Sequence, residues 1–170
     1  MVNRVYIIVL SGLLLALAIV LPIIFHQFQL YGRIFLPMHL PVLLAGALLG
    51  PLSGIMVGLL APGLSFLLTG MPPPYAVPMM TLELPLYGSI IGLCYYRLKL
   101  PLIVSLLLAL IAGRMAFAFG YFIAGYFLQL PYPPETWLYA STITGLPGIA
   151  IQLIFVPVLF PLLSRLSHRC

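Results

Sequence analysis

Charge is the scarcest property of this chain. Only 5% of its 170 residues are charged, and just two of them, Glu83 and Glu135, are acidic. A soluble domain of this size needs many charged residues on its surface, so a soluble fold is excluded. The chain instead carries 64% hydrophobic residues and a mean hydropathy of +1.23. These values predict an integral membrane protein that lies almost entirely in the bilayer.

Motifs for several kinds of chemistry are also missing. The sequence contains no HExxH, no GxSxG and no Walker A pattern, and only one carboxylate, that of Glu83, falls within an apolar run. The two cysteines, Cys94 and Cys170, lack the spacing of metal ligands and are expected to be free thiols. No basic patch alternates with aromatic residues, so nucleic acid is not an expected partner. We therefore expect neither an enzyme nor a metal or cofactor site.

The chain does contain a series of apolar runs, and a transmembrane helix needs about 20 such residues. Proline-rich connections at 70–78 and 129–135 interrupt the series. The expected helices are 5–25, 38–49, 52–68, 79–96, 101–128 and 136–163. We therefore predict an all-α integral membrane protein with a single membrane domain, a bundle of six transmembrane helices whose N- and C-termini are both cytoplasmic.

The number of helices depends on Gly50-Pro51, which interrupts the apolar run that follows residue 38. Proline at this point ends or kinks a helix, so the run forms either two short helices or one long kinked helix. Charge does not decide between them, because both topologies place five cations inside against one outside. A single helix of about 31 residues would be about 46 Å long, against about 30 Å of hydrocarbon, which favours six helices.

The stretch Met71–Gly92 places Glu83 inside an apolar span. An ionisable side chain at the bilayer centre costs about 3 kcal/mol or more, so it is usually kept for a substrate, a proton or a structural partner. Tyr87 shares the face of Glu83 one helical turn later, and Arg114 lies in the following span. Two roles stay open for the opposite charges. They line one polar pocket, or they only neutralise each other inside the bundle.

Other polar and aromatic residues are expected near the same place. His39, at the start of the second span, is either an interfacial histidine or a ligand-binding residue. The fifth span carries aromatic residues on the face of Arg114, and the sixth carries a polar stripe opened by glycine. The candidate substrate-binding residues are His39, Glu83, Tyr87, Arg114, Phe117, Tyr121, Thr144, Gly148 and Gln152.

The first span contains a pair of small residues four positions apart, Gly12 and Ala16. Such a small-xxx-small pair lets another helix approach closely. The approaching helix belongs either to a partner protein or to this chain, and the pattern does not distinguish the two.

Two segments, FLPMHLPVLLAGALLGPLSG and LLTGMPPPYAVPMMTLELPLYG, together with six short helices in 170 residues, carry a family resemblance. The chain resembles the substrate-binding S components of energy-coupling factor (ECF) transporters. The resemblance implies a bacterial or archaeal plasma-membrane protein that binds a water-soluble vitamin or related micronutrient at the outer face. It also implies delivery through a shared module, made of a transmembrane coupling protein and two ATPase subunits. Gly12 and Ala16 would then form the docking surface, where many family members carry two alanines.

The polar residues suggest a first substrate. Arg114 matches a carboxylate and Glu83 matches hydroxyl, amide or amine donors, so pantothenate is the first expectation. Two other functions stay open from the residues: a small channel or facilitator, and a structural membrane subunit without a ligand.

Overall fold

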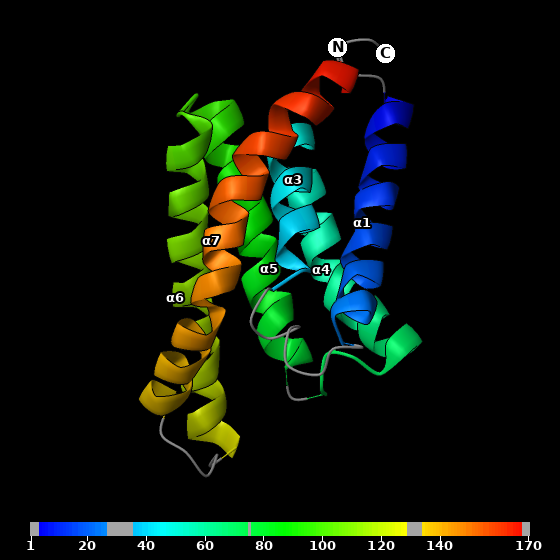
Figure 1. Ribbon diagram of the computed structural model, residues 1–170. Helices are drawn as coiled ribbons and strands as arrows, with labels where there is room; N and C mark the ends of the chain where they lie inside the picture. The colour runs from blue at the N-terminus through cyan, green and yellow to red at the C-terminus, as the bar shows by residue number, and fades with distance from the viewer. Residues whose placement is uncertain (1–3, 27–35, 75, 129–133, 168–170) are drawn as a thin grey trace.

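The computed structural model describes residues 4–26, 36–74, 76–128 and 134–167. Within these ranges the chain is helical: α1 (Arg4–His26), α3 (His39–Leu49), α4 (Pro51–Thr69), α5 (Val77–Gly92), α6 (Leu102–Leu128) and α7 (Pro134–Ser167). A π-helical turn, Leu93–Arg97, extends α5. The prediction of an all-helical, six-helix membrane bundle is confirmed (Figure 1).

The break between α3 and α4 occurs at Gly50, whose φ of 94° lies in the region that favours glycine. Pro51 follows at the first position of α4, where its missing N–H costs nothing. The Gly50 N–H still donates to the carbonyl of Gly46, at 3.0 Å. The two-helix interpretation of this run is therefore correct, and the single long helix is wrong.

The helices differ in length. Within the described part of the chain, five stretches are long and apolar enough to cross a membrane, in α1, α4, α5 with its π turn, α6 and α7, whereas α3 has only 11 residues. At about 1.5 Å per residue α3 is about 16 Å long, roughly half of the hydrocarbon thickness. The start of α1 and the end of α7 lie at one end of the bundle, and the opposite ends of α6 and α7 extend beyond the other helices (Figure 1). The cytoplasmic location of the termini stays a prediction.

The outer surface of the bundle is apolar. Large aliphatic side chains on separate helices are mostly exposed, with 71% for Ile8, 72% for Leu52 and 77% for Leu67. Contiguous apolar surface of this kind would be unfavourable in water, and it matches lipid.

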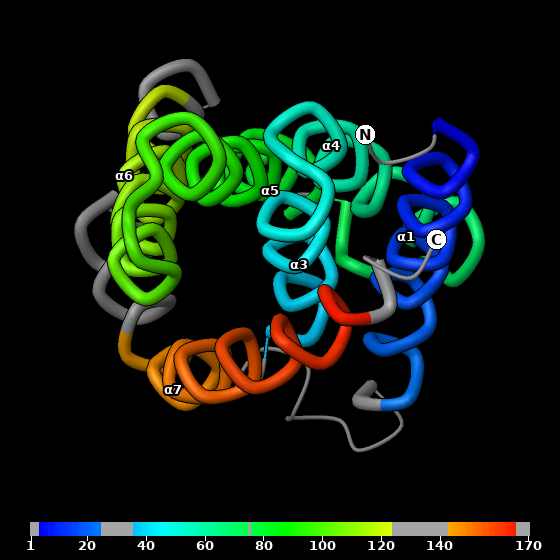
Figure 2. Tube along the Cα trace, turned by 90° about the horizontal axis from the view of Figure 1, so that it is seen from above, coloured from blue at the N-terminus to red at the C-terminus, as the bar shows by residue number. Residues whose placement is uncertain are grey.

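Two of the helices, α4 and α5, pack backbone against backbone. A Cβ added at Gly88 would lie 2.5 Å from the backbone of Gly54, so both positions need glycine for the observed approach. Seen along the bundle, α5, α6, α7 and α3 follow one another in a circuit, while α1 packs against α3 and α4 (Figure 2). A functional site is therefore expected among the side chains that α3, α5, α6 and α7 turn toward one another.

Candidate functional site

A buried carboxylate lies between these helices. Glu83 of α5 is only 2% exposed, and Tyr87, one turn later on the same helix, donates a hydrogen bond of 2.9 Å to its Oε1. The ring of Tyr87 is itself 1% exposed. A Cβ at Gly113 of α6 would lie 2.5 Å from that ring, so the glycine allows the ring to rest on the α6 backbone. The spacing of four residues predicted this pair from the sequence.

Arg114 of α6 supplies the opposite charge. Its Nη1 lies 3.6 Å from Glu83 Oε1, and 15% of its side chain is exposed. Glu83 is about 9 Å from the start of α5, whereas Arg114 is about 21 Å from the end of α6, at about 1.5 Å per residue. The two meet because α6 projects beyond the start of α5 (Figure 1).

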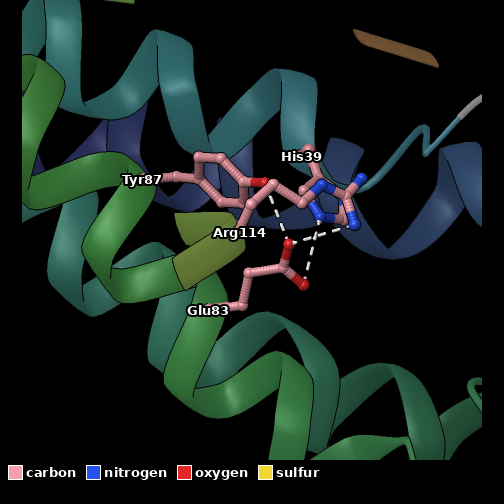
Figure 3. Close-up of polar contacts among 4 residues, drawn as sticks. All are labelled: His39, Glu83, Tyr87 and Arg114. Atoms are coloured by element: carbon pink, nitrogen blue, oxygen red, sulfur yellow. Dashed lines mark hydrogen bonds and ion pairs between the residues drawn. The ribbon is translucent and has the colours of Figure 1, made fainter. Parts of the chain in front are cut away.

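His39, the first residue of α3, completes the cluster. Its Nε2 lies 3.8 Å from Glu83 Oε2, and its ring meets the Tyr87 ring edge-on at 5.2 Å (Figure 3). The histidine is 1% exposed, so its ring lies inside the bundle and not on the outer surface. Because α3 begins here, the positive end of its helix dipole also favours a negative charge at Glu83.

Several buried nitrogen and oxygen atoms, in the cluster and on α7, lack a hydrogen-bond partner among the described residues. They are Nε and Nη2 of Arg114, both ring nitrogens of His39, and both side-chain amide atoms of Gln152. Each such group left without a partner costs about 1 to 3 kcal/mol, and such groups are few in native proteins. Arg114 and Gln152 offer more N–H donors than acceptors, so their natural complement is a group rich in acceptor oxygens.

The structure divides the other predicted residues into two groups. Phe117, one turn from Arg114, stacks on Tyr121 with ring centroids 6.2 Å apart, and Tyr121 is buried. On α7, Gly148 and Gln152 are buried, whereas the side chain of Thr144 is exposed. The stripe expected along α7 is thus buried only in part.

One residue next to the cluster was not singled out from the sequence. A Cβ at Gly145 of α7 would lie 2.8 Å from Arg114 Nη2 and 3.3 Å from Leu36 Cδ1. Gly145 is thus the backbone against which the guanidinium rests, and Gln152 lies two turns further along the same face of α7. With 15 glycines in the chain, nothing in the sequence distinguished this one.

The small-residue pair of α1 faces outward. Gly12 and Ala16 are exposed, while Leu14 and Ala18 on the other side of the helix are buried. A Cβ at Gly12 would meet none of the described residues within 4 Å. The alternative that this pair packs inside the monomer is therefore wrong.

Fold and site together define a small multi-pass membrane protein with a buried, charged cluster shared by three of its helices. Among the residues that the structure describes, no group of His, Cys, Asp and Glu could hold a metal ion. Residues 7–160 match the family model described as "ECF transporter, substrate-specific component". The chain belongs to this family.

Membership of the family fixes the coarse function. The chain is a transporter subunit, not an enzyme, and a multi-pass protein of the prokaryotic plasma membrane that works with an ECF module and a small substrate. No curated protein and no solved structure matches the chain.

Proposed function

We propose that this subunit binds a water-soluble vitamin or related micronutrient at the cluster of His39, Glu83, Tyr87 and Arg114. The remaining candidates extend the site along α6 and α7: Phe117, Tyr121, Thr144, Gly148 and Gln152. Binding takes place from the outer side of the membrane, and the ATP-driven module then delivers the substrate to the cytoplasm.

The observation that carries the proposal is the set of buried N–H donors that have no hydrogen-bond partner among the described residues. A purely structural ion pair would be expected to use the N–H groups of its arginine within the protein, because leaving them unpaired in a dry interior is unfavourable. Here Arg114 approaches Glu83 through Nη1, while its Nε and Nη2 are buried without a partner among the described residues. A substrate with acceptor oxygens would satisfy them.

Pantothenate is the leading substrate. It carries one carboxylate, one amide and two hydroxyl groups, which match an arginine, a buried amide such as that of Gln152 and an aromatic wall such as Phe117 and Tyr121. Nicotinate has no amide or hydroxyl group, and pyridoxine-type and base-like vitamins have no carboxylate, so they match fewer of these groups at once. Folate-like vitamins, which carry carboxylates and an amide, are the alternative substrates.

The coupling surface in this proposal is the Gly12/Ala16 face of α1. It is exposed, it offers a shallow surface to a helix of the transmembrane coupling protein, and small residues allow close approach in lipid. The two ATPase subunits of the module supply the energy through that coupling protein.

Mass spectrometry of the small molecule released from the purified protein tests the proposal most directly. We expect a vitamin at one molecule per chain, and calorimetry on ligand-free protein should return the same stoichiometry. Protein that releases no small molecule and shows no calorimetric signal with a panel of water-soluble vitamins would contradict the proposed function.

A further inference from the structure

We infer that the Nε/Nη2 edge of Arg114, beside Gly145 of α7, is the subsite for a carboxylate of the substrate. In this arrangement Glu83 is a positioning residue that holds the guanidinium and does not contact the substrate. The inference rests on the proposed function and narrows it to substrates that carry a carboxylate.

The planar shape of the Arg114 guanidinium gives it one edge that suits a carboxylate. It is planar, with N–H groups that leave it along fixed directions, and its Nε–Nη2 edge presents two nearly parallel N–H bonds. Nη1 is the atom that approaches Glu83, at 3.6 Å, whereas Nε and Nη2 are buried and have no hydrogen-bond partner within the described part of the chain. The edge of Arg114 without a partner is therefore the Nε–Nη2 edge, and the spacing of its two N–H groups matches the two oxygens of a carboxylate.

Both carboxylate oxygens of Glu83 face other groups of the protein. Its Oε1 accepts the hydrogen bond of Tyr87 and faces Arg114, while its Oε2 faces His39. With 2% exposure, the carboxylate is enclosed by side chains of three helices (Figure 3). Its contacts are with the protein, and their effect is to fix the direction in which the free edge of Arg114 points.

Gly145 of α7 leaves the space in which the guanidinium lies. Nη2 of Arg114 rests where a side chain at this position would be, since an added Cβ would lie only 2.8 Å away. Any larger residue would push the guanidinium off its present plane or displace α7. The glycine thus determines where the free edge lies, which makes Gly145 a positioning residue for the recognition of acids.

The charges are compatible with an incoming anion. The carboxylate would meet Arg114 directly, and this attraction, together with the positive end of the α3 dipole at His39, opposes the repulsion from Glu83, whose Oε1 lies 3.6 Å from Nη1. Hydrogen bonds between charged groups are shorter and about twice as strong as neutral ones, which offsets the cost of burying the new charge.

The test compares acids with their neutral counterparts on the purified full chain. The probes are pantothenate with pantothenol, nicotinate with nicotinamide, and biotin with biotinamide, each titrated by calorimetry. At least one acid should bind about 30-fold more tightly than its neutral counterpart, the loss expected when a buried charged donor pair is left unpaired. Equal affinities within every pair that binds would overturn the subsite and leave the proposed function intact. No binding by any of the three acids would overturn the subsite, and the vitamin panel described above would then decide the proposed function separately.

Three variants test which residues cause the preference for the acid over its neutral counterpart. Gly145→Ala should weaken binding of the acid about tenfold or more and binding of the neutral counterpart far less. Gly63→Ala on α4, where a Cβ would meet none of the described residues within 4 Å, should change neither affinity. Arg114→Lys keeps the charge but loses the two-bond edge, so it should strongly reduce the preference for the acid, which tests the subsite even if Gly145→Ala proves unstable.

Glu83→Gln separates positioning from contact. Glutamine still accepts the Tyr87 hydrogen bond but holds the guanidinium less firmly, so a positioning role predicts weaker binding of the acid and a far smaller change for the neutral probe, as for Gly145→Ala. Selective loss of the neutral probe would place Glu83 on the substrate and overturn its role as a positioning residue.

Discussion

Separate and joint removal of Glu83 and Arg114 tests whether this pair serves binding or only folding. At 3.6 Å, and at an effective dielectric constant of about 20, their attraction is about 4 to 5 kcal/mol before desolvation is counted. Removing one partner of such a buried pair typically costs about 3 to 5 kcal/mol of stability. Because Arg114 is 15% exposed, we expect the lower part of that range.

The two single substitutions should not be equivalent. In Arg114→Met the carboxylate keeps the hydrogen bond from Tyr87 and can take up a proton. In Glu83→Met the guanidinium stays charged in an apolar site, since it cannot lose its proton. We therefore expect a lower melting temperature for Glu83→Met than for Arg114→Met. The double variant, with Gln at 83 and Met at 114, should recover most of the lost stability.

The assay is thermal unfolding in detergent, combined with calorimetric titration of the vitamin identified from the purified protein. The stable double variant should bind about 30-fold less tightly or worse, corresponding to about 2 kcal/mol. A well-folded double variant with normal affinity would refute the reasoning, because the pair would then serve only the fold.

Three further predictions concern the packing, the coupling surface and the hydrogen bond. Gly88→Ala should lower stability by about 1 to 3 kcal/mol because its Cβ must separate α4 from α5, while Gly63→Ala should not lower the melting temperature, because alanine favours a helix over glycine and its Cβ would meet none of the described residues within 4 Å. Ala16→Leu should abolish vitamin uptake in cells that express the complete transporter yet leave binding to the isolated subunit intact, and Ala150→Leu, at an exposed alanine of α7, should affect neither. Tyr87→Phe should cost about 1 kcal/mol by removing the 2.9 Å hydrogen bond to the buried carboxylate, measurable as reduced thermal stability.

Much of the architecture follows from the sequence alone, because it depends on local chemistry. Helix lengths follow from apolar runs, and the end of α3 follows from Gly50-Pro51. The contact of Tyr87 with Glu83 follows from helical periodicity, since residues four apart lie on one face. Because a charge in lipid is costly, the sequence alone indicated Glu83 and Arg114 as candidate residues of a site.

Only the tertiary structure decided which helices present which faces to the cluster. The burial of His39 depends on α3 starting halfway along the bundle, and the meeting of Arg114 with Glu83 depends on α6 projecting beyond α5. The place of Gly145 against the guanidinium depends on the rotation of α7 about its axis. Axial shifts and rotations of this kind are set by the packing of whole helices, often through backbone contacts at glycine, and a one-dimensional pattern of residue types does not contain them.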